Sequence, residues 1–165
     1  MSKKFKTTLC MDFDGVIHGY QSGFQGHRII PDPPVPGALD FLSKAVDTFD
    51  VAIYSTRSSH FGGRRAMKRW LHKHACNYIN QIVQENGDWV KEGTRKYPFL
   101  RWFELDATMP FEIIVRDGAD RFVKALSWPR SKPPAIVSID DRALTFTGQW
   151  PTIESLQHFK PWNKR

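Results

Sequence analysis

An apolar segment that ends in two closely spaced aspartates constrains the fold of this chain more than any other stretch. Residues 7–13 are β-prone, and the run ends in Asp12 and Asp14, with Gly15 directly after them. Alternate side chains of a strand share a face, so the two carboxylates start out pointing the same way. Two like charges that close are unfavourable unless a cation or a shared proton compensates them, and carboxylate oxygens suit Mg²⁺. An ordinary polar turn is the alternative interpretation.

Length and composition favour a single folded domain. The chain has 165 residues, of which 41% are hydrophobic and 13% aromatic, enough for a real core. No run approaches the roughly 18 apolar residues of a membrane span, and the basic N-terminus lacks the signal-peptide pattern. The two cysteines have no CxxC pairing, so neither a disulfide framework nor a zinc site is indicated. We expect one domain over residues 1–165, without membrane association, in the cytoplasm.

The charge balance points to anionic partners. Lys and Arg number 24 against 17 Asp and Glu, which gives a net charge of +7. Such an excess favours phosphorylated substrates, nucleotides or nucleic acid. The charge is dispersed along the chain, so simple solubility is the alternative reason for it.

Hydrophobic patterning predicts an α/β protein. A strand at 7–13, a helix at 38–49 and a strand at 50–55 follow in the order of a parallel crossover, with a loop rich in Gly and Pro at 18–36. Further expected elements are a helix at 64–78, a strand at 111–115, a short helix at 121–126, a strand at 135–139 and a short helix at 153–158. Residues 77–109 show no clear hydrophobic periodicity of a helix or a strand. The expected architecture is a parallel sheet flanked by helices.

Three of the predicted strands end in residues whose side chains can bind a ligand or take part in catalysis. In an open parallel sheet, ligands bind at the carboxyl ends of the strands. The residues that would meet at this edge are Asp12 and Asp14, Ser55 and Arg57, and Asp140 and Asp141. Four carboxylates at one edge repel one another unless a divalent cation lies among them. With a hydroxyl, a guanidinium and the nearby Lys132, the site suits a phosphoryl group.

The order and spacing of these motifs resemble the phosphatases of the haloacid dehalogenase superfamily. Residues 12–16, Asp-Phe-Asp-Gly-Val, resemble the first motif of that superfamily, Asp-x-Asp-Gly-Thr/Val. Ser55 resembles the second motif, Lys132 the third, and residues 139–142, Ile-Asp-Asp-Arg, the acidic fourth. The resemblance covers residues 7–58 and 130–145, and it is to small members with little or no cap, of the bacterial and phage type. It implies a Rossmann-like parallel sheet.

The resemblance implies Mg²⁺-dependent hydrolysis of a phosphomonoester through an aspartyl-phosphate. Asp12 would be the nucleophile. Asp14 would protonate the leaving oxygen and then take a proton from water, which requires a pKa nearer neutrality than that of Asp12. Ser55 would donate a hydrogen bond to the transferred phosphoryl group, and Lys132 would offset its charge.

The same resemblance implies a metal site at the paired acids. Mg²⁺ would be held by Asp12, by the main-chain carbonyl of Asp14, and by Asp140 or Asp141. An oxygen-only set of this kind suits a hard cation. All four aspartates are therefore candidate metal residues.

Several assignments stay open at the level of sequence. Lys124 is the alternative to Lys132, and Thr56 is the alternative to Ser55. Gly15, Thr56 and Arg57 are candidate substrate-binding residues, although Arg57 could equally form a surface salt bridge. The loop histidines near the site, which we expect to be solvated, are His18, His27 and His60.

The spacing between motifs leaves room for only a small lid. The loop after the first motif is too short for a helical cap, and a small lid or insertion could occupy about residues 80–110. Aromatic residues between positions 89 and 103 could form this lid or a stacking surface for bases, or belong to the core. A phosphotransferase using the same aspartate is one alternative function. A nucleic-acid-binding protein that keeps the fold without turnover is another.

Overall fold

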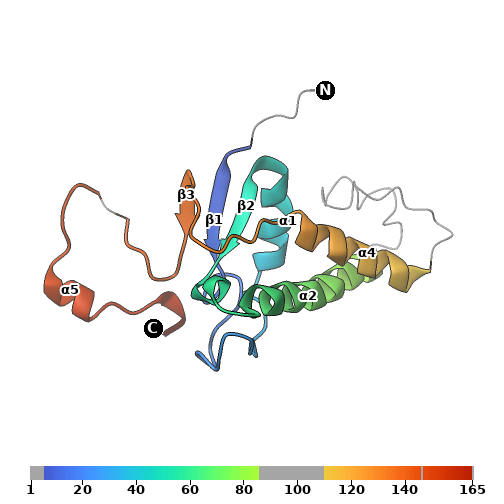
Figure 1. The fold of residues 1–165 in the computed structure, drawn as a ribbon, viewed down its shortest axis with the longest axis horizontal. Helices are drawn as coiled ribbons and strands as arrows, with labels where there is room; N and C mark the ends of the chain where they lie inside the picture. The colour runs from blue at the N-terminus through green and yellow to red at the C-terminus, as the bar shows by residue number, and fades with distance from the viewer. Residues whose placement is uncertain (1–5, 86–109, 146, 165) are drawn as a thin grey trace.

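The sheet of this protein is small, parallel and centred on its first strand. The computed structural model describes residues 6–85, 110–145 and 147–164. Strands β1 (Thr8–Asp12), β2 (Asp50–Tyr54) and β3 (Val137–Ile139) form one sheet in the order β2-β1-β3, as Figure 1 shows. Both pairings are parallel, with Asp12 opposite Tyr54 and Met11 opposite Ile139. The carboxyl ends of all three strands therefore meet at one edge, as the sequence predicts.

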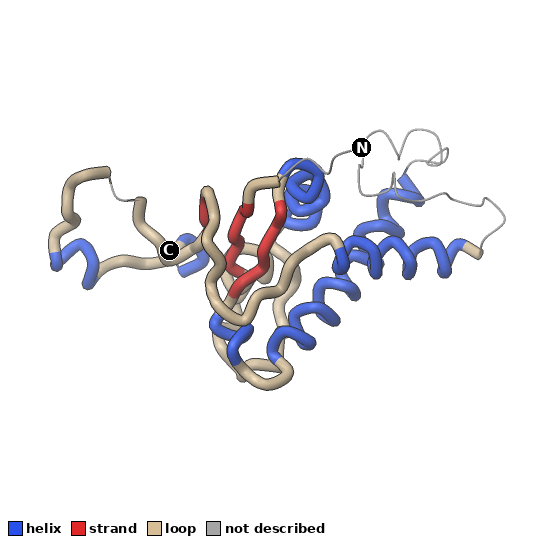
Figure 2. The backbone as a smooth tube through the Cα atoms, turned by 45° about the horizontal axis from the view of Figure 1, so that its top comes forward, coloured by secondary structure: helices blue, strands red, loops and turns tan. Residues whose placement is uncertain are grey.

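The long helices lie on the β2 side of the sheet. Helices α1 (Ala38–Thr48), α2 (Gly63–Glu85) and α4 (Phe111–Lys124) follow one another there, and α2 packs along α4 (Figures 1 and 2). The 3₁₀ helix η1 (Thr56–Ser59) joins β2 to α2. This arrangement confirms the predicted α/β class.

Residues 147–164 form an arm on the side of β3 that faces away from β1 (Figure 1). We call it the C-terminal arm. It carries α5 (Ile153–Gln157) and η3 (Trp162–Lys164). The arm leads away from the sheet and returns, so that η3 lies beside the loop that follows β1 (Figure 1).

Burial is concentrated in β1, β2 and the helices. The two strands are buried at their centres, and Phe13 directly after β1 has no exposed surface. Helix α2 buries one stripe that includes Met67 and Leu71, and α4 contributes Phe122. The backbone of Ser127 extends the sheet beyond β2, because its N–H and C=O bond to Val51 and Ile53 at 2.9 Å each. Strand β3, in contrast, is exposed at all of its residues.

Three sequence predictions about secondary structure need correction, and a fourth needs extension. The predicted strand at 111–115 is wrong, because these residues open helix α4, which also absorbs most of the short helix predicted at 121–126. Ile114, Gly118 and Phe122 are buried at four-residue spacing, which is the period of a helix. A short apolar run cannot be assigned to strand or helix by periodicity alone. The late strand is shorter than predicted, and α2 continues past residue 78 to Glu85. Most of the predicted lid, residues 86–109, lies outside the described residues.

Candidate active site at the carboxyl end of the sheet

Three aspartates from two neighbouring strands meet at the edge of the sheet. Asp12 is the last residue of β1, and Asp140 and Asp141 directly follow β3. Each of these three, the acidic triad, offers a carboxylate oxygen within 4.8 Å of the others. The side chain of Asp141 has no exposed surface, and neither of its oxygens has a hydrogen-bond partner among the described residues. Arg142 Nε lies 3.7 Å from Asp141 Oδ2, beyond hydrogen-bond distance. Three clustered carboxylates with one of them buried and without a hydrogen-bond donor are costly unless a further cation compensates them, so the triad is a candidate metal site.

Gly15 is required for the close approach of Asp141. Its φ of +86° lies in the left-handed region, which favours glycine. A Cβ at this position would collide with the carboxylate of Asp141. The carbonyl of Gly15 accepts a hydrogen bond of 2.8 Å from Trp162 Nε1 in the C-terminal arm. Gly15 therefore shapes the triad through its backbone, and the structure gives no sign of the predicted substrate contact.

The proximity of the carboxylates alters their acidity. Burial raises the pKa of Asp12 from 3.8 to about 7, the nearby charges of Asp140, Asp14 and Asp141 add to this, and the backbone N–H of Phe13 acts against it. Burial also raises the pKa of Asp141, and the neighbouring charge of Arg142 opposes the rise. A divalent cation would favour the ionised form of both groups.

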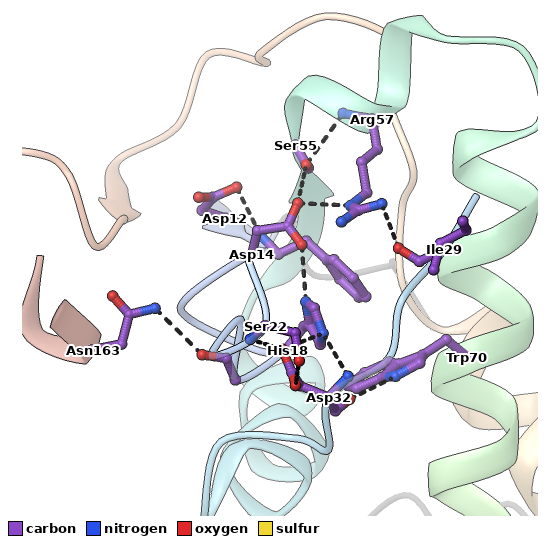
Figure 3. A network of polar contacts seen from close by, with 12 residues as sticks. Asp12, Asp14, His18, Ser22, Ile29, Asp32, Ser55, Arg57, Trp70 and Asn163 are labelled. Atoms are coloured by element: carbon purple, nitrogen blue, oxygen red, sulfur yellow. Dashed lines mark hydrogen bonds and ion pairs between the residues drawn. The ribbon is translucent and has the colours of Figure 1, made fainter. Parts of the chain in front are cut away.

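Asp14 lies apart from the triad and is held by its own partners. Its Oδ2 accepts hydrogen bonds from Arg57 Nε at 2.7 Å and Ser55 Oγ at 3.2 Å, and its Oδ1 lies 2.9 Å from His18 Nδ1 (Figure 3). Burial alone would raise the pKa of Asp14, but the hydrogen bonds from His18 and Arg57 lower it below its usual value. This corrects the predicted order, because it is Asp12 rather than Asp14 whose pKa lies near neutrality. The Asp14 carboxylate is not part of the acidic triad, and the Mg²⁺ ligand predicted at this residue, its main-chain carbonyl, stays a prediction.

His18 links Asp14 to a second buried carboxylate. The imidazole is fully buried, so the expectation of a solvated loop histidine is wrong for this residue. The backbone N–H of Asp32 donates to His18 Nε2 at 3.2 Å, which assigns the ring proton to Nδ1 and makes that nitrogen the donor to Asp14. Asp32 in turn accepts two hydrogen bonds from Ser22, and its carbonyl accepts one from Trp70 (Figure 3). The chain of contacts fixes the loop after β1.

Arg57 is a buried positioning residue. Its side chain is fully buried, and Nη1 donates to the carbonyls of Gly26 and Ile29 at 2.6 and 3.0 Å. Ser55 caps η1 by accepting from the Arg57 N–H, which places both residues just after β2. The surface salt bridge considered for Arg57 is wrong, because the side chain is fully buried, and its contact to substrate stays a prediction. Arg57 instead holds the carboxylate of Asp14.

A pocket of about 250 Å³ brings most of the predicted catalytic residues together. The predicted residues that line it are Asp12, Asp14, Ser55, Thr56, Lys132 and Asp140. Lys132 Nζ lies 3.9 Å from Asp140 Oδ2, whereas Lys124 ends α4 and does not line the pocket. This placement favours Lys132 over its alternative.

Sequence reasoning missed two aromatic residues and an arginine in the pocket. Tyr20, Tyr54 and Arg142 also line it, and the guanidinium of Arg142 lies 5.8 Å from the ring centroid of Tyr20. Arg142 could have been suspected, because it follows the acidic pair directly. Tyr20 lies in a loop whose path no local pattern predicts.

The chain matches no family model, no curated protein and no solved structure. Among the described residues, no helix is both long enough and apolar enough to span a membrane. The chemistry of the protein is therefore inferred from the residues of the pocket.

Proposed function

We propose that the protein is a Mg²⁺-dependent phosphomonoester hydrolase of the haloacid dehalogenase type, acting in the cytoplasm through an aspartyl-phosphate. The observation that carries the proposal is the acidic triad, whose buried Asp141 carboxylate has no described hydrogen-bond partner, beside a pocket that also holds Ser55 and Lys132. The same proposal includes a Rossmann-like fold of the haloacid dehalogenase type. It is supported by a central β1 flanked by the strands that lead to Ser55 and Asp140.

The triad fits a hard divalent cation. Its donors are carboxylate oxygens only, which suits Mg²⁺ and gives no preference to softer metals. Asp12, Asp140 and Asp141 would hold the ion. When bound, the cation supplies positive charge that favours ionised carboxylates and offsets the repulsion between an anionic nucleophile and a phosphate.

The chain's own groups then divide the reaction between them. A carboxylate oxygen of Asp12 attacks phosphorus, the bond from phosphorus to the ester oxygen breaks, and the leaving oxygen either takes a proton from protonated Asp14 or departs as the anion. Water then attacks the phosphoryl group of the aspartyl-phosphate, loses a proton and regenerates Asp12. Thr56 and Lys132 line the pocket where the phosphoryl oxygens would lie. Ser55 would donate to them after releasing Asp14.

Asp14 suits one of its two assigned roles better than the other. Its ionised form is stabilised by Arg57 and His18, so it is ready to accept a proton from water. Proton donation to the leaving oxygen requires Asp14 to be protonated before the step, and the contacts to Arg57 Nε and His18 Nδ1 keep that form little populated, so this role is less favoured. Esters with weakly basic leaving groups, such as aryl phosphates, should therefore be the more readily cleaved.

The proposal is tested by phosphate release from p-nitrophenyl phosphate, with Mg²⁺ or with EDTA. Asp12→Asn removes the nucleophile and should reduce release to the background rate, whereas Asp47→Asn, an exposed aspartate on α1, should match the wild type. Acid quenching with ³²P-labelled substrate should trap label on the wild type and none on Asp12→Asn. Turnover that survives in Asp12→Asn would contradict the proposal. Transfer of the label to an added alcohol instead of water would indicate the phosphotransferase.

A further inference from the structure

A second cavity, distinct from the acidic pocket, is lined by arginines. Its volume is about 640 Å³, and the arginines around it are Arg28, Arg64, Arg65, Arg69 and Arg130. Among the described residues, neither aspartate nor glutamate lines it. The volume is in the range of pockets that hold a ligand as large as a nucleotide. We call it the arginine cavity.

The arginines of this cavity are not neutralised by carboxylates in the described part of the chain. None of the five forms an ion pair with a described carboxylate. The side chains of Arg65, Arg69 and Arg130 are exposed and make no hydrogen bond with a described residue. Arg65 and Arg69 stand four residues apart on α2 and so face the same side, where like charges destabilise a helix. Such an arrangement favours a ligand that brings several negative charges.

The arginine cavity adjoins the acidic pocket through η1. Thr56, the first residue of η1, lines the acidic pocket, and Ser58 and Ser59 at its other end line the arginine cavity. A 3₁₀ helix rises about 2.0 Å per residue, so Thr56 and Ser59 are about 6 Å apart along its axis. The two hollows are thus close enough along the chain for an extended ligand with several phosphates to reach from one to the other.

An exposed aromatic ring stands at the arginine cavity. Phe61 is 90% exposed, and the guanidinium of Arg28 lies 5.1 Å from its ring centroid. Exposed aromatic rings beside a cationic groove are the surfaces on which the bases of single strands stack. Arginine forks also match phosphate oxygens better than lysine does.

We propose that the arginine cavity binds the backbone phosphates of a single-stranded nucleic acid whose terminal phosphate lies at Asp12. This inference rests on the proposed hydrolase function and adds the class of its substrate. Several phosphates in succession are what five arginines require, and a base next to them would stack on Phe61. A compact polyphosphate would use the arginines but would leave the exposed surface of the Phe61 ring uncovered.

The binding test uses a fluorescein-labelled single-stranded octanucleotide with a 3′- or a 5′-terminal phosphate. Fluorescence anisotropy is measured over a range of salt concentrations in the Asp12→Asn background, so that no turnover intervenes. Arg65→Ala combined with Arg69→Ala should weaken binding on the order of tenfold and reduce the slope of log K against log[salt] by about 1.4, since each phosphate contact on a single strand contributes about 0.7. Arg116→Ala, an exposed arginine on α4, should leave the slope unchanged. Circular dichroism checks that the double variant is folded.

A kinetic arm compares the octanucleotide with a mononucleotide in the Asp12-containing protein. The double variant should lose about tenfold more kcat/KM on the octanucleotide than on the mononucleotide, as expected when remote contacts are removed. An unchanged salt slope in the double variant would overturn the inference, as would inositol hexakisphosphate binding more tightly than the octanucleotide. Should the slope change while no substrate releases phosphate, the hydrolase proposal fails and the binding of nucleic acid stands.

Discussion

At the scale of single residues, the site separates two aspartates that the sequence places one residue apart. Asp12 faces other carboxylates and has its pKa raised to about 7, whereas hydrogen bonds from His18 and Arg57 lower the pKa of Asp14. The two groups therefore differ in charge near neutral pH in the absence of a cation. His18 and Arg57 together keep Asp14 ionised, and because the Arg57 guanidinium is fully buried, replacing it would leave Asp14 without its main counter-charge.

The raised pKa of Asp12 predicts how stability depends on pH. Between about pH 4 and 7, Asp12 stays protonated in the folded chain and ionises in the unfolded chain, so its contribution to stability falls as pH rises through this window. Asp12→Asn removes this term. In EDTA at pH 8 the variant should be more stable than the wild type, by up to about 4 kcal/mol at about 1.4 kcal/mol per pKa unit.

Chemical denaturation at pH 4 and pH 8 measures this difference. The advantage of Asp12→Asn should nearly vanish at pH 4, and Mg²⁺ at pH 8 should stabilise the wild type more than the variant. Asp47→Asn serves as the matched control and should follow the wild type throughout. A variant that is less stable than the wild type in EDTA at pH 8 would contradict the raised pKa.

At the scale of elements, the hydrophobic pattern of the sequence and the tertiary packing agree for β1, β2 and α1 and disagree at residues 111–115. The predicted strands at 7–13 and 50–55 and the helix at 38–49 are confirmed as β1, β2 and α1. The run at 111–115 contains three apolar β-branched residues and yet forms the first turns of α4. Packing against α2 favours the helix, because it buries Ile114, Ala119 and Phe122 along one face.

Because α4 is a helix, replacing two neighbouring isoleucines should change the free energy of unfolding by very different amounts. Ile114 is 5% exposed and Ile113 is 51% exposed. Ile114→Ala should lower the free energy of unfolding by about 2–5 kcal/mol, whereas Ile113→Ala should change it by no more than about 0.5 kcal/mol. Urea denaturation of both variants provides the measurement. Equal losses, or a larger loss at Ile113, would contradict the helix.

At the scale of the whole molecule, the C-terminal arm is joined to the loop that shapes the triad. Trp162, Asn163 and Lys164 donate hydrogen bonds to the carbonyls of Gly15, Gly19 and Gln21 at 2.8, 3.3 and 3.1 Å. Residues nearly 150 positions apart in sequence are thus brought together. The arm contributes to the shape of the active site without supplying a group to the pocket described above.

The contact between Trp162 and Gly15 predicts a long-range effect on cation binding. Trp162→Phe keeps an aromatic ring but removes the donor to the Gly15 carbonyl, which should cost about 0.5–1.5 kcal/mol of stability. Because Gly15 also supports Asp141, Mg²⁺ affinity measured by calorimetry should fall a few-fold, within what about 1 kcal/mol allows. Ile153→Ala, at a 72% exposed position on the same arm, is the control. Equal Mg²⁺ affinities in wild type and Trp162→Phe would show that the arm does not support the triad.

The sequence by itself determined the α/β class, the two long strands, and the edge of the sheet at which Asp12, Ser55 and Asp140 meet. These follow from hydrophobic period and from the rule that parallel strands align their carboxyl ends. Only the tertiary structure decided that Arg57 and His18 are buried against Asp14, that Asp141 packs on Gly15, and that five dispersed arginines surround one cavity. The physical reason is that charge pairing and burial depend on which distant segments touch, whereas periodicity depends only on neighbours along the chain.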